Sequence, residues 1–135
     1  MCRKPADTAR LAGRLIKDFN ATVWLLQGPL GAGKTTLVRG LLRALGYTGR
    51  VTSPTFTLQH PYRLRHQRWD YVVHVDAYRL RRKSEAAALD LTAWQANPRC
   101  LLVVEWPERL HLTADHPLKI RLDYHPRGRL VRVRY

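Results

Sequence analysis

A segment near residue 30 combines glycines, a lysine and hydroxyl side chains at a spacing suited to holding phosphate groups. It reads Gly28-Pro29-Leu30-Gly31-Ala32-Gly33-Lys34-Thr35-Thr36. Up to Thr35 it fits the pattern G-x-x-x-x-G-K-[ST], in which glycines let consecutive backbone N–H groups point at an anion. A helix that begins near Lys34 would aim its positive dipole end at the same phosphates. The sequence therefore predicts a loop that binds a nucleoside triphosphate.

The residues of this loop have distinct expected roles. We expect Lys34 to reach the β- and γ-phosphates and neutralise their charge, and Thr35 to ligate Mg²⁺ through its hydroxyl. The backbone of Gly31–Gly33 would hold the phosphates, and Thr36 would touch the α-phosphate. A glycine-rich turn without a ligand is the alternative, but the strand expected before the loop and the helix after it favour a nucleotide site.

Two acidic residues follow apolar strands elsewhere in the chain. Asp76 follows Val72–Val75, and Glu105 follows Leu101–Val104. Because the carboxyl ends of strands in an open α/β sheet face the ligand crevice, we expect both acids to converge on the phosphates. Thr35 and Glu105 would hold Mg²⁺ directly or through water, and Asp76 would orient or polarise the attacking water. Which acid lies nearer the metal stays open, as does the alternative of two surface carboxylates.

His74 alternates with Val73 and Val75, so its side chain is expected on the opposite face of that strand. Asp76, two residues further on, would share this face. A hydrogen-bonded structural role for His74 is favoured over a role as general base.

The elements that must position these residues follow from the hydrophobic pattern. The first helix is capped by Asp7 or Thr8 and buries Leu11, Leu15 and Phe19. The elements expected after it are a strand over 22–27, a helix from 34 that stops at Gly46, a loop over 47–57, a strand over 71–75, a short helix over 85–89 capped by Ser84, a strand over 100–104 and a hairpin over 120–133 with its turn at 125–128. Helices interleaved with buried strands favour the α/β class. We predict a single domain over residues 1–135, with a mixed, mostly parallel sheet flanked by helices and a C-terminal β-hairpin.

Composition and charge limit the classes of protein that fit. The 135 residues are 45% hydrophobic and 25% charged, which is typical of one globular domain and excludes a multidomain synthetase. There are 24 Lys and Arg against 10 Asp and Glu, a formal net charge of +14. This balance favours polyanions, namely nucleic acid, nucleotides or an acidic partner surface. Direct contact with tRNA and a merely solvated basic surface both stay open.

The sequence shows no segment that suggests a membrane or an oxidising compartment. The longest apolar run near the C-terminal half, Leu101–Val104, is far shorter than the roughly 20 residues of a membrane span. With no signal peptide recognised, we expect a cytoplasmic protein without a membrane partner. Cys2 is expected as a thiol at a mobile chain end and Cys100 as a core thiol, with no disulfide and no zinc site.

Four segments in this order resemble one known family. They are Gly31-Ala32-Gly33-Lys34-Thr35-Thr36, Thr52-Ser53-Pro54-Thr55-Phe56-Thr57-Leu58, His74-Val75-Asp76-Ala77-Tyr78-Arg79-Leu80 and Val104-Glu105-Trp106-Pro107-Glu108. Together they resemble the TsaE (YjeE) family, small P-loop ATPases required for making threonylcarbamoyladenosine in bacterial tRNA. The resemblance extends from Thr8 to the last hairpin.

The resemblance implies further residue roles. The family's switch-like loop, which senses the γ-phosphate, corresponds to Ser53, Pro54 and Thr55. Its acid implicated in catalysis corresponds to Asp76, and its Mg²⁺-associated acid to Glu105. Residues that help to bind the nucleotide correspond to Thr8, Trp106 and Arg129.

The resemblance also implies partners and a working cycle. The family's partners are the paired proteins TsaB and TsaD, and its ATP cycle is thought to reset that complex between turnovers. For this chain we expect slow hydrolysis of ATP with Mg²⁺ when alone, and a loop over 50–58 that ATP orders and phosphate loss releases.

Three other classes of function stay open on the sequence. A small-molecule kinase would need an arginine-rich lid, which the cluster at 79–83 could mimic, but no acceptor site is recognisable. A non-enzymatic adaptor would use ATP binding alone to drive assembly. An RNA-binding module would carry a vestigial ATP site.

Overall fold

The computed structural model describes residues 1–52 and 58–135, except for the side chain of Lys83. The predicted switch residues Ser53, Pro54 and Thr55 lie outside the described residues. No helix in the described part is long and apolar enough to cross a membrane.

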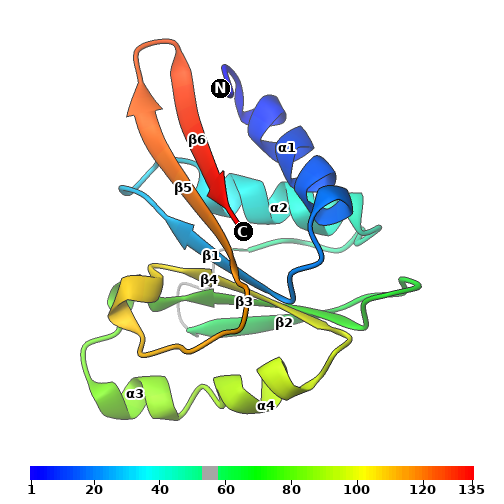
Figure 1. Ribbon diagram of the computed structural model, residues 1–135, viewed down its shortest axis with the longest axis vertical. Coiled ribbons are helices and arrows are strands. Elements are labelled where there is room, and N and C mark those ends of the chain that lie inside the picture. The colour runs from blue at the N-terminus through cyan, green and yellow to red at the C-terminus, as the bar shows by residue number, and fades with distance from the viewer. Residues whose placement is uncertain (53–57) are drawn as a thin grey trace.

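Six strands form one mixed sheet, in the order β2-β3-β4-β1-β5-β6 (Figure 1). The strands are β1 Val23–Gln27, β2 Gln59–Arg63, β3 Tyr71–Asp76, β4 Cys100–Glu105, β5 Leu118–His125 and β6 Gly128–Arg134. The four inner strands run parallel, and the two edge strands, β2 and β6, pair antiparallel with their neighbours. This arrangement confirms the predicted α/β class, the mostly parallel sheet and the C-terminal hairpin formed by β5 and β6.

Helices cover both faces of the sheet (Figure 1). The helices are α1 Pro5–Asp18, α2 Lys34–Ala44, α3 Lys83–Ala87 and α4 Leu91–Ala96, with short 3₁₀ helices η1 Ala77–Arg79 and η2 Pro107–Arg109. Helices α1 and α2 pack together on one face, and α3 and α4 lie on the other. The expected α/β layering is therefore present around the sheet.

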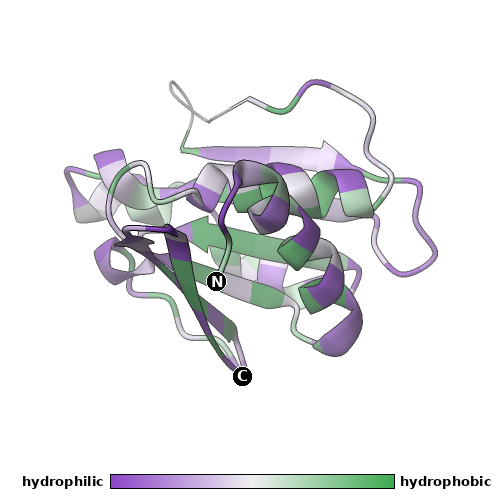
Figure 2. Cartoon of the chain, turned by 90° about the horizontal axis from the view of Figure 1, so that it is seen from above, coloured by the Kyte–Doolittle hydropathy of each residue, from purple (hydrophilic) through white to green (hydrophobic). Residues whose placement is uncertain are grey.

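Strand β4 shows how the two cores arise. Leu101 and Val103 join the cluster beneath α1 and α2, whereas Leu102 and Val104 join the cluster on the α3–α4 face. Successive side chains of a strand point to opposite faces, so a strand buried on both faces has a continuous apolar run. Figure 2 shows the hydrophobic residues concentrated in the central strands.

The chain departs from the sequence predictions at its N-terminus. Helix α1 begins at Pro5, earlier than the predicted caps, because proline is preorganised for the first turn and has no N–H to satisfy there. Asp7 lies inside this turn, where its Oδ2 accepts from the backbone N–H groups of Arg3 and Lys4, both at 2.9 Å. Cys2, expected at a mobile end, is only 5% exposed and forms a bridge with Arg129 of β6.

Three further elements differ from the prediction. Helix α3 spans Lys83–Ala87 with Arg82 at its N-cap, so Ser84 lies within the helix and not at its cap. The side chain of Glu85 accepts from the backbone N–H of Arg81 at 2.9 Å and so satisfies a donor at this end. Strand β2 and helix α4 were not expected from the sequence.

Candidate functional site

The glycine-rich segment forms the turn between β1 and α2, as predicted. Gly28 and Gly33 have φ values of 138° and 103°, which side-chain-bearing residues rarely adopt. A Cβ atom at Gly28 would also overlap the backbone carbonyl of Leu122 in β5. Gly33 is the N-cap of α2, so the turn delivers Lys34 and Thr35 directly onto the first turn of that helix.

Lys34 is buried at the start of α2. Its Nζ donates to the carbonyl oxygens of Gly28 at 2.7 Å and Pro29 at 2.8 Å. Burial lowers the pKa of this ammonium group, and the charges of Glu105 and Asp76 act in the opposite direction. Neutral carbonyl groups therefore hold the Lys34 ammonium beside the turn, and a negatively charged ligand could replace them as its hydrogen-bond partners.

An aromatic pair covers one side of Lys34. Its Nζ lies 4.5 Å from the ring centroid of Trp106, a cation–π distance. Trp106 has a positive φ of 58°, and its ring packs against Tyr78 at 5.0 Å. A non-glycine residue in this backbone region costs free energy, and such residues concentrate at functional sites.

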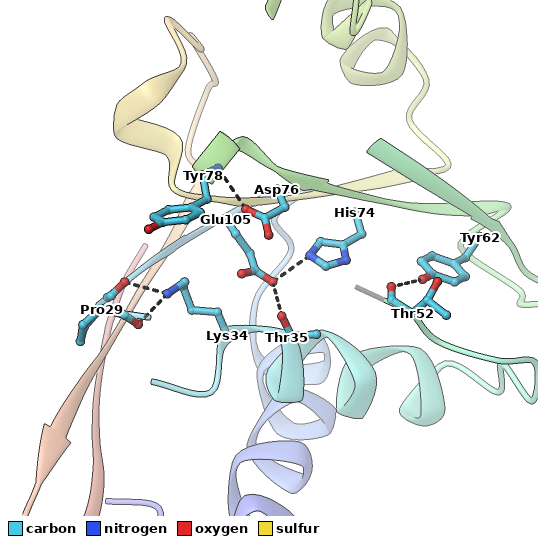
Figure 3. A network of polar contacts seen from close by, with 10 residues as sticks. Pro29, Lys34, Thr35, Thr52, Tyr62, His74, Asp76, Tyr78 and Glu105 are labelled. Carbon is cyan, nitrogen blue, oxygen red and sulfur yellow. Dashed lines mark hydrogen bonds and ion pairs between the residues drawn. The ribbon is translucent and has the colours of Figure 1, made fainter. Parts of the chain in front are cut away.

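Glu105 is the centre of a buried polar network (Figure 3). Its Oε1 accepts from the hydroxyl of Thr35 at 3.0 Å and lies 2.8 Å from Nε2 of His74. His74 is fully buried, and its Nδ1 has no hydrogen-bond partner among the described residues. This arrangement favours the tautomer with the proton on Nε2, since the proton is then shared with the carboxylate and Nδ1 needs no acceptor.

Asp76 lies beside Glu105, because the two residues are register partners at the ends of β3 and β4. Its Oδ1 accepts from the backbone N–H of Tyr78 at 3.0 Å. Burial raises the pKa of Asp76. The hydrogen bond from Tyr78 is the next largest influence and lowers this pKa, and the nearby charge of Glu105 raises it by a smaller amount. The expected convergence of the two acids on the glycine-rich turn is thus present in the structure.

The turn, the two acids and the aromatic pair line one pocket of about 490 Å³. A second pocket of about 180 Å³ lies on the other side of the turn and is lined by Thr8, Thr36, Arg129 and the backbone of Gly31–Gly33. Arg129 donates from Nη2 to the carbonyl oxygen of Gly31 at 3.3 Å. The structure therefore divides the predicted residues between two pockets, which share Gly31, Gly33 and Thr36 along the turn.

The donor atoms of Thr35 and Glu105 have a spacing that fits Mg²⁺. An octahedral Mg²⁺ binds oxygen at about 2.1 Å, so two adjacent ligands lie about 3.0 Å apart. Thr35 Oγ1 and Glu105 Oε1 are 3.0 Å apart. One hydroxyl and one carboxylate also match the usual Mg²⁺ site, in which phosphate oxygens and water supply the other ligands.

Some parts of the site were not recognised in the sequence. His74 was expected as a structural residue, but its contact with Glu105 was not predicted. The alternation of His74 with the valines could be read from the sequence, and it placed His74 on the same strand face as Asp76. The contact with Glu105 also depends on the register of β3 against β4, which could not be read from the sequence. Arg109, which stacks over Tyr78 at 4.9 Å, carried no signal at all.

The fold and the glycine-rich turn define an α/β protein with the strand–turn–helix arrangement of P-loop proteins. A family model described as "Threonylcarbamoyl adenosine biosynthesis protein TsaE" matches residues 2–131. The chain belongs to the TsaE family.

Curated relatives agree with this assignment. A protein of Mycobacterium bovis named "tRNA threonylcarbamoyladenosine biosynthesis protein TsaE" is 40% identical over 126 residues, covering 87% of this chain and 73% of that protein. A Synechocystis protein of the same name is 46% identical over 91 residues, covering 66% of this chain and 56% of that protein. The chain thus spans little more than half of the Synechocystis relative.

A solved structure shares the fold. The crystal structure of Bacillus subtilis YdiB superposes with a TM-score of 0.64 at 25% sequence identity. The superposition covers 95% of this chain and 78% of YdiB.

Proposed function

We propose that residues 1–135 act as one domain that binds ATP with Mg²⁺ and hydrolyses it in the biosynthesis of threonylcarbamoyladenosine in tRNA. The observation that carries the proposal is the meeting of Lys34, Thr35, Asp76 and Glu105 in the 490 Å³ pocket. Phosphoryl transfer depends mainly on positioning and on electrostatic stabilisation, and these four side chains supply both. Because tRNA is modified in the cytoplasm, we assign the activity to that compartment.

Each side chain has a task in this proposal. The ammonium of Lys34 exchanges the carbonyls of Gly28 and Pro29 for phosphate oxygens, which bind it more strongly because they are charged. Thr35 and Glu105 hold the metal, and their 3.0 Å spacing supports Glu105 as the acid nearer to it. Bound Mg²⁺ neutralises charge on the phosphates. Asp76 accepts a hydrogen bond from the attacking water, and its raised pKa strengthens it as a proton acceptor.

Membership of the TsaE family supports the biological setting. The relatives are named for threonylcarbamoyladenosine biosynthesis in tRNA. In the proposed cycle, the chain is an ATP-driven switch on the TsaB–TsaD complex, with a slow turnover that the complex accelerates. The segment over 50–58, including Ser53, Pro54 and Thr55, follows the state of the γ-phosphate.

Phosphate release from ATP tests the proposal, measured for the chain alone and with purified TsaB, TsaD and tRNA. We expect Lys34→Ala to lose nucleotide binding. Asp76→Asn should retain binding but release phosphate about 100-fold more slowly, the usual loss when a positioned proton acceptor is removed. Asp115→Asn removes an exposed carboxylate that lines neither pocket of the candidate site; it is the matched control and should resemble the unchanged protein.

Two results would contradict the proposal. Turnover that is indifferent to the partner proteins would rule out the switch. If Glu105→Ala kept both nucleotide binding and the turnover rate, the non-enzymatic adaptor would be the better description. Release of free phosphate without an added acceptor separates hydrolysis from the kinase alternative.

A further inference from the structure

A groove is lined by α1, α2 and the segment that precedes α1. Its volume is about 1280 Å³, and its lining comes from the N-terminal segment and the two helices. The lining includes small residues, among them Ala9, Gly13, Gly40 and Ala44. The helices approach so closely that a Cβ atom at Gly40 would overlap the backbone of Ala9. The floor of the groove is therefore shallow and largely apolar.

Basic side chains line both sides of this floor. They are Arg3, Arg10, Arg14 and Lys17 on the α1 side and Arg39 and Arg43 on α2. Asp7 is the one acid that lines the groove in the described part of the chain, and it is already paired with Arg10 at 2.6 Å. Within residues 1–52 and 58–135, no ion pair is formed by Arg3, Arg14, Lys17 or Arg39.

The spacing of these cations is unfavourable for the isolated helices. Arg10 and Arg14 are four residues apart on α1, and Arg39 and Arg43 are four residues apart on α2. Like charges at this spacing repel each other on a helix surface. Arg43 is partly compensated, since its Nη1 donates to the carbonyl oxygen of Tyr47 at 2.6 Å. An anionic partner would relieve the repulsion on both helices at once.

We propose that this groove binds an acidic amphipathic helix of a partner protein. The apolar stripe of such a helix would lie on the small residues of the floor, and its carboxylates would pair with arginines on both sides. The groove favours a protein helix over a single-stranded nucleic acid, because no aromatic residue lines it to stack on bases and small apolar residues form much of its floor. Thr36 lines this groove and also both pockets of the candidate site, so the two surfaces adjoin at the start of α2.

Fluorescence anisotropy with a labelled synthetic peptide tests the inference on the whole chain. The probe is a helical peptide of about 20 residues with leucine and alanine on one face and glutamate on both flanks. A control peptide has the same composition in a scrambled order that lacks the apolar stripe. The test variant is Arg14→Glu with Arg39→Glu, one change on each helix. Arg65→Glu with Arg134→Glu alters two exposed cations outside the groove and gives the same change in net charge.

We expect the striped peptide to bind the unchanged protein and the Arg65/Arg134 control equally. The Arg14/Arg39 variant should bind about tenfold more weakly, as expected for the loss of two surface ion pairs. Circular dichroism verifies folding, and Arg14→Gln with Arg39→Gln replaces the test variant if the charge reversal unfolds the chain.

Three outcomes would overturn the inference. Equal binding of the scrambled peptide would mean general charge attraction without a groove. If the chain binds tRNA but not the striped peptide, and the Arg14/Arg39 change abolishes tRNA binding, the surface belongs to a nucleic-acid site. If the chain self-associates in analytical ultracentrifugation and the same change abolishes that association, the groove binds a second copy of the chain. None of these measurements uses ATP, so they do not bear on the proposed hydrolysis.

Discussion

Asp76 and Glu105 show how adjacent strand ends give two carboxyl groups different surroundings. Both close an inner parallel strand, and they are register partners. Glu105 has two side-chain contacts, to Thr35 and His74, whereas among the described residues Asp76 accepts one hydrogen bond, from the backbone N–H of Tyr78. The less supported carboxyl group lies half-buried beside a second acid, which is a costly place for a negative charge.

The raised pKa of Asp76 predicts that its charge destabilises the folded protein. Above the unfolded-state pKa of 3.8, folding must bury a charge that the unfolded chain leaves in water. This cost appears as the pH rises from 3.8 through the higher folded-state pKa, and it is constant above that. Asp76→Asn keeps an oxygen for the Tyr78 N–H and removes the charge. We therefore expect this variant to be more stable than the unchanged protein at about pH 7.

Urea denaturation over a range of pH measures this effect. The gain in stability should shrink toward zero as the pH falls to 3.8, because both states are then increasingly neutral at this residue. Asp115→Asn, at an exposed loop position, is the control and should change little. A variant less stable than the unchanged protein near pH 7 would show that the carboxylate stabilises the fold.

At the scale of elements, the packing of α1 against α2 holds in place the helix that carries part of the candidate site. Helix α2 carries Lys34 and Thr35 on its first turn, and α1 packs along it. Two glycines lie at this interface, but they are under different constraints. A Cβ atom at Gly40 would overlap the backbone of Ala9, whereas a Cβ atom at Gly13 would lie 3.3 Å from Cβ of Ala44.

Substitution of these glycines by alanine should change the stability of the protein by different amounts. Gly40→Ala must push α1 away from α2, and we expect it to lower the free energy of unfolding by about 1–3 kcal/mol, the usual cost of overpacking. Gly13→Ala needs only a small adjustment and gains up to about 1 kcal/mol of helix propensity, so its net effect should be near zero or stabilising. Thermal or urea denaturation of both variants tests this. Equal decreases in the free energy of unfolding for the two variants would mean that the close approach of Gly40 to the backbone of Ala9 does not limit the packing of α1 on α2.

The elements that the sequence predicted are those with a strong local pattern. Strand β4 is a continuous apolar run that ends in Glu105, β3 is apolar from Tyr71 to Val75 except at His74, and α1 and α2 repeat their apolar residues at helical spacing. Strand β2 was missed because it contains Pro61 and only one of its residues, Tyr62, is buried. It forms by pairing with β3 at the edge of the sheet, where a proline is tolerated. Helix α4 was missed because its six residues bury no side chain fully.

The residues of the candidate site were also predictable where a local sequence pattern marks them. The order of strand, glycine-rich turn and helix indicated Lys34 and Thr35, and acids after apolar runs indicated Asp76 and Glu105. The link from His74 to Glu105 depends on the register between β3 and β4, which sequence patterns do not give. The stacking of Trp106 on Lys34 depends on a positive φ that tryptophan does not indicate.

At the scale of the whole molecule, the N-terminal segment joins the C-terminal hairpin. The N–H of Cys2 donates to the carbonyl oxygen of Arg129 at 2.9 Å, and the N–H of Arg129 donates to that of Cys2 at 2.7 Å. Cys2 is buried at this junction, and Cys100 is buried in the central strand β4. Exposure of the Cys2 thiol therefore requires the terminal segment to detach, whereas exposure of the Cys100 thiol requires the central sheet to open.

We expect the thiols to react with a disulfide reagent at different rates in the native protein. Cys2 becomes accessible when the terminal segment detaches locally, whereas Cys100 requires opening of the sheet. Burial also raises the pKa of Cys100 to about 11, which reduces its reactive thiolate. In the single-thiol variants Cys2→Ser and Cys100→Ser, Cys2 should react at least about tenfold faster, since tenfold corresponds to only about 1.4 kcal/mol in opening free energy. In urea the difference should largely disappear, and equal native rates would mean that the molecule opens as one unit.

The contacts of the glycine-rich turn also decide when it can form during synthesis. Gly28 rests against Leu122, and the carbonyl of Gly31 accepts from Arg129, so residues made early are supported by residues made about a hundred positions later. Local pairing cannot complete such an arrangement, since contacts between distant positions form late and slowly. While the chain is still on the ribosome, residues 28–35 therefore lack this support until residue 129 has emerged. Under the proposed function, nucleotide therefore stabilises only a chain that has been synthesised through residue 129.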